Sequence, residues 1–131
     1  MEISSLSMLA LMFLLHFFAD FNLQLQAGMD KFKQKKWWDD QIPKNRPDLR
    51  IKYGCDYRVG LVCHGMFWAL VVCLPLLMRG GDWYFWQALV NGIIHSDIDD
   101  LKANQNLINL AQDQAMHVVQ ILLIWSCWVI W

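Results

Sequence analysis

Apolar residues along the chain gather in four long segments that are separated by polar stretches. A helix needs about 20 predominantly apolar residues to span a lipid bilayer. Two segments reach this length with few ionisable residues, and the other two carry more of them. The pattern predicts an all-α protein, an integral membrane four-helix bundle in one transmembrane domain that covers residues 1–131. The predicted helices cover about residues 3–26, 57–78, 83–101 and 107–131, with a loop at 28–56.

A soluble helical bundle is the alternative to the membrane interpretation. A helix at the surface of a soluble protein needs a polar face, and residues 61–78 offer almost none. Hydrophobic residues make up 56% of the chain and charged residues 18%, against roughly 45–50% and ~25% in soluble domains. This composition also excludes a disordered chain, a coiled coil and a collagen-like chain. We therefore expect a lipid bilayer around the bundle.

Basic residues are concentrated in the loop at 28–56, which holds eight of the eleven Lys and Arg residues and five of the twelve Asp and Glu residues. Loops rich in Lys and Arg stay on the cytoplasmic side of a membrane. The sequence therefore predicts a multi-pass protein of the inner (cytoplasmic) membrane, with this loop inside and both termini periplasmic. Tryptophans at the outer ends of the last two predicted helices agree with an aromatic belt. They are Trp83, Trp86, Trp125, Trp128 and Trp131.

Local signals refine the helix ends and the character of the loop. The pair Gly80 and Gly81 predicts a turn between the second and third helices, and Asn106 is the expected N-cap of the fourth. Residues 29–38 contain lysines and a Trp pair that suit a short helix at the headgroup boundary, with a solvated basic loop as the alternative. We expect the loop at 28–56 to engage an anionic lipid or a protein partner. No nucleic-acid partner is expected, and a homo-oligomer is an open alternative to a monomer.

Seven ionisable residues interrupt the predicted spans, and three His/Asp pairs among them are spaced four residues apart. That spacing puts both side chains of a pair on one face of a helix. Polar groups inside a membrane are costly and face the interior of a bundle. With a rise of about 1.5 Å per residue, all seven fall in the cytoplasmic half of helices that alternate in direction, so we expect them to meet. They are His16, Asp20, His64, His95, Asp99, Asp113 and His117.

Imidazole and carboxylate groups in such a cluster are typical metal ligands. They bind Zn, Mn and Fe, and a cation would offset the cost of burying several carboxylates. We therefore predict that the seven residues bind a divalent metal, with Zn as the first expectation and Mn or Fe as alternatives. One metal and two metals both fit this number of residues. Two other interpretations stay open, namely a polar network that ties the helices together and a proton or ion relay.

A metal site of this kind could also be catalytic. A metal-bound water would act as the nucleophile, with an Asp as general base. Lys102 lies on the same helix face as the His/Asp pair of the third helix and would hold an anionic headgroup or a phosphate, or else reach to the membrane interface. Asp20, Asp99 and Lys102 are the predicted catalytic residues. Gln114 is expected to point away from the neighbouring Asp, and Asp97 is expected to be solvated.

Four motifs in chain order carry a family resemblance. They are HFFADFNLQ at 16–24, His64, HSDIDDLK at 95–102 and DQAMH at 113–117. These motifs are similar to those of a family of small membrane proteins from bacteria and their phages, catalogued as domain of unknown function 3307. The loop at 28–56 is longer than that pattern usually has. The family has no assigned activity, and its arrangement of His and Asp on helices distantly resembles membrane-bound metal-dependent hydrolases.

Three functions follow as hypotheses. The first is a membrane-embedded metalloenzyme, most simply a hydrolase that acts on a lipid or phosphate-bearing substrate at the cytoplasmic side. The second is a binding or transport protein that holds a metal or passes protons. The third is a small bacterial or phage protein in which the cluster is a structural polar network, and whose loop at 28–56 engages a host partner or anionic lipid.

Overall fold

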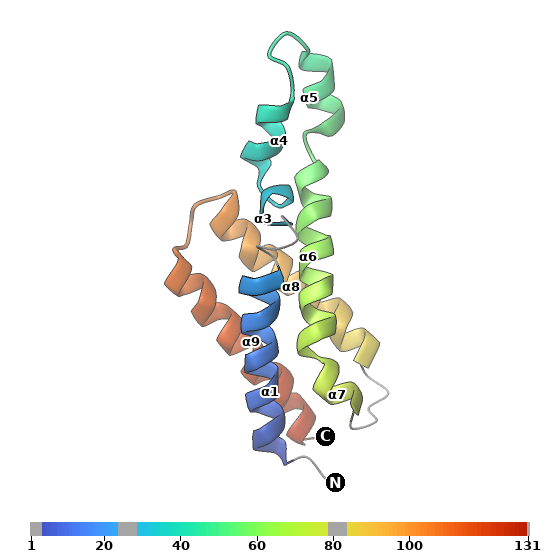
Figure 1. The fold of residues 1–131 in the computed structure, drawn as a ribbon, viewed down its shortest axis with the longest axis vertical. Coiled ribbons are helices and arrows are strands. Elements are labelled where there is room, and N and C mark those ends of the chain that lie inside the picture. The colour runs from blue at the N-terminus through green and yellow to red at the C-terminus, as the bar shows by residue number, and fades with distance from the viewer. Residues whose placement is uncertain (1–3, 24–28, 79–83, 131) are drawn as a thin grey trace.

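The computed structural model describes residues 4–23, 29–78 and 84–130, and regular structure in these ranges is helical, without strands. The long helices run in alternating directions, and α1 begins at the end of the molecule where α9 ends (Figure 1). The all-α prediction is confirmed. The four long helices are α1 (Ser5–Phe17), α6 (Asp56–Val72), α8 (Tyr84–Ala103) and α9 (Leu110–Ile130).

The first predicted helix changes its geometry partway along. The α-helical part α1 ends at Phe17, and a π-helix, η1 (Phe18–Leu23), continues it. Single π-helical turns occur frequently at functional sites, and this one carries Asp20. The remainder of the predicted helix, beyond residue 23, lies outside the described residues.

The second predicted helix, at 57–78, is interrupted near its end. The helix α6 stops at Val72, and α7 (Leu74–Met78) follows after Cys73. Pro75 explains the interruption, because a proline has no backbone N–H to donate and its ring crowds the preceding turn.

The predicted loop at 28–56 contains three short helices, so its description as a single loop is wrong. They are α3 (Met29–Phe32), α4 (Lys35–Gln41) and α5 (Pro47–Tyr53). The alternative of a short helix at 29–38 is met in part by α3 and α4. The pair α4 and α5 projects beyond the bundle, away from the end of α9 (Figure 1).

The start of α9 differs from the prediction. Asn109, rather than Asn106, is the N-cap: its side-chain oxygen accepts the backbone N–H of Gln112 at 3.0 Å, and the Gln112 side chain accepts the Asn109 backbone N–H at 2.9 Å. This reciprocal pair is a capping box. Asn106 has a φ of 54°, a left-handed conformation that asparagine tolerates in a turn.

A close crossing joins α6 and α8 at Gly65 and Gly92. A Cβ atom at Gly65 would collide with the carbonyl oxygen of Gly92. The Ser96 hydroxyl lies 3.0 Å from a backbone carbonyl oxygen of α6 and bonds the two helices. Small residues and hydroxyl groups at a crossing let helix backbones approach closely. His64 directly precedes Gly65 and His95 follows Gly92 by three residues, so the crossing brings the two imidazoles together.

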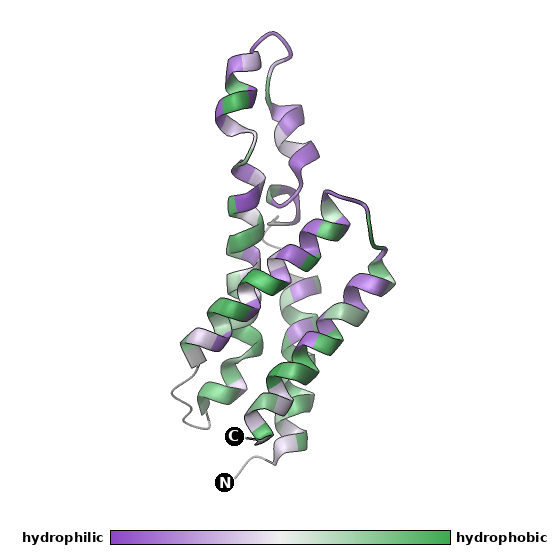
Figure 2. Cartoon of the chain, turned by 180° about the vertical axis from the view of Figure 1, so that it is seen from behind, coloured by the Kyte–Doolittle hydropathy of each residue, from purple (hydrophilic) through white to green (hydrophobic). Residues whose placement is uncertain are grey.

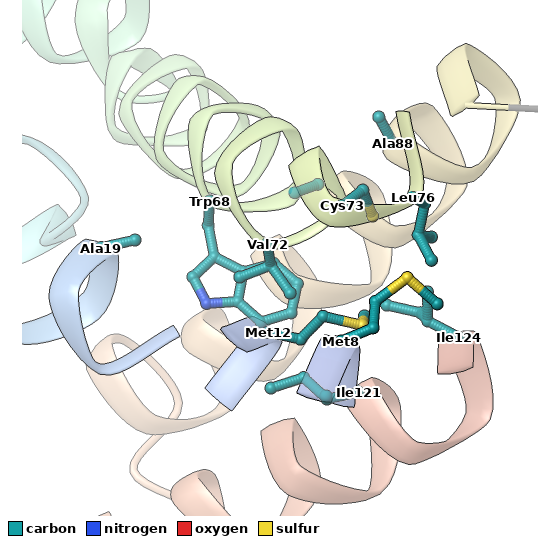
Figure 3. Packing of buried hydrophobic residues seen from close by; sticks show 11 residues of the cluster. Met8, Met12, Ala19, Trp68, Val72, Cys73, Leu76, Ala88, Ile121 and Ile124 are labelled. Carbon is teal, nitrogen blue, oxygen red and sulfur yellow. The ribbon is translucent and has the colours of Figure 1, made fainter. Parts of the chain in front are cut away.

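An apolar core fills the bundle on the side of its termini. Met8 and Met12 of α1 point toward Val72 of α6 and Ile121 of α9 (Figure 3). Along each long helix these residues lie one or two turns from the predicted metal ligands. Trp68 closes the core where it meets the polar residues.

The predicted aromatic belt is met only in part. Trp86 is exposed, but Trp125 and Trp128 pack against the core instead of facing outward. The Trp125 indole N–H also donates to the backbone of α1 at 2.8 Å. Trp83 and Trp131 lie outside the described residues.

The outer surface of the bundle is rich in exposed apolar side chains. Leu14, Val59, Phe85 and Val119 are examples, one from each long helix. Hydrophilic residues concentrate in α4 and α5 and in the neighbouring ends of α8 and α9 (Figure 2). By length and mean hydropathy, one described helix, Pro47–Met78, could cross a membrane, and the apolar helix Ser5–Phe21 is shorter. Four spans are not reached by this criterion, because the polar residues inside the bundle lower the hydropathy of α8 and α9.

Candidate metal centre

The polar side chains of the long helices and of η1 meet at one place inside the bundle. Six of the seven predicted ligands form two overlapping groups, in each of which one ligand atom per residue lies within 4.8 Å of the others. All six residues are buried. The first group is Asp20, His64, His95 and Asp99, and the second is Asp20, Asp113 and His117.

The first group is built around two facing imidazoles. His64 Nε2 lies 3.2 Å from His95 Nε2, 3.3 Å from Asp99 Oδ2 and 3.5 Å from Asp20 Oδ1. Two ligands of a tetrahedral zinc ion lie about 3.3 Å apart when each bond is about 2.0–2.1 Å long. The distances around His64 therefore match those between ligands of one ion.

The ring of His95 is fixed by stacking. It packs on Trp68 with 4.1 Å between ring centroids and 12° between planes, and on His117 with 4.1 Å between centroids. Such contacts hold a ligand ring in one orientation before a metal arrives, which is how neighbouring groups tune a metal site. The sequence carried no signal for this role of Trp68.

The second group contains buried polar atoms without a hydrogen-bond partner among the described residues. His117 Nε2 lies 3.4 Å from Asp99 Oδ1 and 3.5 Å from Asp113 Oδ1, and none of these three atoms makes a hydrogen bond. A buried polar atom without a partner carries the full cost of its desolvation. A metal ion, or a proton on His117 shared with the two carboxylates, would remove that cost.

Two lysines contact the cluster, and the sequence prediction included only one of them. Lys33, on the turn between α3 and α4, donates to Asp99 Oδ2 at 2.6 Å, and both side chains are buried. Lys102 donates to Asp113 Oδ2 at 2.5 Å. Lys102 was predicted to hold an anionic headgroup or a phosphate. In this structure its ammonium group contacts a carboxylate of the cluster instead. Lys33 carried no signal of its own, because it is one of several lysines in a basic stretch.

His16 belongs to neither ligand group. The Trp68 indole N–H donates to His16 Nδ1 at 2.9 Å, so the His16 proton is on Nε2, which donates to Gln114 Oε1 at 3.2 Å. The Gln114 amide then donates to Asp20 Oδ2 at 2.9 Å. His16 thus orients the cluster through Gln114. The expectation that Gln114 points elsewhere is wrong, because its long side chain reaches across from α9 to η1.

The charges of the cluster nearly balance without a metal. Three carboxylates, from Asp20, Asp99 and Asp113, face the ammonium groups of Lys33 and Lys102. With neutral imidazoles the net charge is therefore −1. The cluster therefore carries one negative charge more than its two lysines offset, which a proton on an imidazole or a bound metal ion would counter.

Asp97 is exposed, as predicted, while Gln24 of the first motif lies outside the described residues.

Comparisons of the chain with protein-family models, with curated proteins and with solved structures found no match. The resemblance to small bacterial and phage membrane proteins stays a prediction.

Proposed function

We propose that this chain is a membrane-embedded protein whose His/Asp cluster binds a divalent metal ion. The observation that carries the proposal is the spacing of 3.2–3.5 Å between His64 Nε2 and three other buried atoms that can bind a metal, His95 Nε2, Asp20 Oδ1 and Asp99 Oδ2. Mixed imidazole and carboxylate ligands suit Zn, with Mn or Fe as alternatives. One divalent ion would change the net charge of the cluster from −1 to +1.

The burial pattern supports four membrane spans, formed by α1, by α6 with α7, by α8 and by α9. Ionisable groups are buried beside the apolar core, and large apolar side chains are exposed along the long helices, a combination that is unusual in a soluble protein. Ionisable groups within membrane spans face the bundle interior in the same way. Loop 28–56, with its net charge of +3, would lie on the cytoplasmic side.

Hydrolysis of a lipid or phosphate-bearing substrate at the cytoplasmic side is the reaction class that we propose for such a site. A bound metal would supply an activated water, and Asp20 or Asp99 would accept its proton. Lys102 is 26% exposed, whereas Lys33 is 3% exposed. An anionic substrate would therefore reach the cluster at Lys102 and compete with Asp113 for its ammonium group.

A proton relay or a structural polar network is the second candidate. The contacts of Lys33 with Asp99 and of Lys102 with Asp113 favour it, because they neutralise two of the three carboxylates without a metal. A single proton on one imidazole would complete the balance.

Metal content separates these candidates. Protein purified in detergent and exposed to Zn²⁺ should retain metal after desalting, measured as a metal-to-protein ratio. His95→Ala should lower that ratio, because the ion loses a ligand, and should lower the melting temperature, because the ring that stacks on Trp68 and His117 is removed. Asp97→Ala is the matched control and should change neither, since Asp97 is exposed on the same helix. A metal-free wild type, or an unchanged ratio in His95→Ala, would leave the relay or network as the function.

A further inference from the structure

The cluster has two halves that share carboxylates, and this inference rests on the metal binding proposed above. Each half contains at least three residues whose ligand atoms lie within 4.8 Å of one another, and Asp20 belongs to both. Three protein ligands are the number found in catalytic zinc sites. Each half could therefore hold an ion of its own.

The two oxygens of Asp20 face different halves. Oδ1 lies 3.5 Å from His64 Nε2, in the first half. Oδ2 accepts the Gln114 amide at 2.9 Å, and the same amide donates to Asp113 Oδ2 at 3.1 Å, in the second half. A carboxylate oriented in this way can bridge two metal ions, which in two-metal sites lie about 3.5–4 Å apart.

Asp99 has the same arrangement. Its Oδ2 lies 3.3 Å from His64 Nε2 and its Oδ1 lies 3.4 Å from His117 Nε2. Asp99 and Asp20 come from different helices, so a pair of bridging carboxylates would join η1 to α8. Paired bridging carboxylates with imidazoles on the outside are the ligand pattern of di-metal helical bundles.

Three of the buried atoms that lack a hydrogen-bond partner among the described residues lie in the second half or border it. Asp99 Oδ1, Asp113 Oδ1 and His117 Nε2 are buried without a hydrogen-bond partner among the described residues. An ion in the first half alone would leave Asp113 Oδ1 unsatisfied, because Asp113 is not in the first group. These atoms point to a second ion.

The charge balance then identifies a further ligand. Two divalent ions add four charges to a cluster of −1 and give +3, which is costly in a buried site. An oxyanion with several negative charges, such as phosphate, would offset this excess and can bind between two metal ions. Lys102, whose side chain is partly exposed, contacts the second half through Asp113, and an anion would enter there.

We propose that the cluster is a two-metal centre bridged by Asp20 and Asp99, and that it binds a phosphate-type oxyanion. The ligands of the first ion are His64 and His95, and those of the second are Asp113 and His117. The anion is either free phosphate or the phosphate group of a lipid.

Manganese is a suitable probe, since two adjacent Mn²⁺ ions give an exchange-coupled electron paramagnetic resonance signal. Wild type titrated with Mn²⁺ and phosphate should bind two ions per chain and give the coupled signal. Asp113→Asn should bind one ion and give the signal of isolated Mn²⁺, because Asn keeps the volume of Asp but not its charge. His117→Ala is the second variant, with the same expected loss, and Asp97→Asn is the control that should keep both ions.

The results distinguish the two-metal centre from the proposed binding of a single metal ion, on which it rests. One ion per chain in wild type, unchanged in Asp113→Asn and lost in His95→Ala, would overturn the two-metal centre and keep metal binding. No bound metal in wild type would overturn both.

The binding of the oxyanion is tested by a separate measurement. Phosphate, compared with chloride, should raise the apparent affinity for the second Mn²⁺ by roughly five- to 150-fold, the usual range for coupling between sites. The same titration in nanodiscs with and without phosphatidic acid tells a lipid phosphate from free phosphate. An increase with either anion supports the proposal, and no change with both would overturn the oxyanion.

Discussion

Lys33 lies on the turn between α3 and α4 and reaches Asp99 at 2.6 Å, with both side chains buried. The turn is tied to the end of α8, because Asn104 donates to the Lys33 carbonyl oxygen at 3.0 Å and accepts the Lys35 backbone N–H at 2.6 Å. The backbone contacts therefore set where the ammonium group lies. Lys33 acts as a resident cation at the first half of the cluster.

Replacing Lys33 with Met should destabilise the metal-free protein, because Asp99 would keep its buried charge without the ammonium group. Breaking a buried ion pair by removing one partner costs about 3–5 kcal/mol, which thermal unfolding in detergent can measure. Lys31→Met is the control, since Lys31 is exposed. Adding Asp99→Asn to the Lys33→Met variant should recover most of the loss. A Lys33→Met protein as stable as wild type would show that the ion pair contributes little.

The spacing of His and Asp residues was enough to predict most of the site. Pairs four residues apart mark one helix face, and their equal depth predicted that they meet. The same reasoning could not find Lys33, whose position depends on a turn outside the long helices. It also could not give Trp68 or Gln114 their roles, because an aromatic ring or an amide in an apolar helix has no periodic signature.

At the scale of helices, the crossing of α6 and α8 fixes the distance between His64 and His95. Gly65→Ala should test it. Alanine favours an isolated helix over glycine by about 1 kcal/mol. We nevertheless expect a net loss of about 1–3 kcal/mol, because the new methyl group would collide with the Gly92 carbonyl oxygen. Unfolding in detergent measures the change.

Val62→Ala is the control for this crossing, since Val62 lies on α6 with an exposed side chain. Gly65→Ala should also weaken metal binding, as the imidazoles on the two helices move apart. Higher stability in Gly65→Ala than in wild type would mean that the helices do not meet there.

The long helices follow from the apolar segments, but their interruptions needed other information. Pro75 could have marked the end of α6, since a proline restricts the turn before it. The capping box of Asn109 and Gln112 has a sequence signature of its own, an Asn followed three residues later by a Gln, so the N-cap could also have been predicted at Asn109 instead of Asn106. The π-helix η1 was not readable, because it depends on how Asp20 packs against the neighbouring helices.

At the scale of the whole molecule, the charge distribution along the bundle predicts which of its ends faces the cytoplasm. Residues 28–56 have a net charge of +3 and the rest of the chain −4. The described cysteines, Cys55, Cys63, Cys73 and Cys127, are free, so all would be replaced before labelling. Lys44→Cys should then resist a membrane-impermeant maleimide in intact cells and react after permeabilisation, because basic loops stay in the cytoplasm.

Ser4→Cys is the matched position at the opposite end of the bundle, and it is exposed. It should react in intact cells. Labelling of Lys44→Cys from outside, with Ser4→Cys protected, would reverse the proposed topology.

The distribution of the proposed metal ligands over η1, α6, α8 and α9 has a consequence for how the protein is made. Asp113 and His117 are on α9, which leaves the ribosome after every other helix of the bundle. Asp20 and Asp99 are therefore synthesised before the partners of the second half exist. A complete site appears only when α9 docks, so loading with metal would report that the nascent chain has finished assembling.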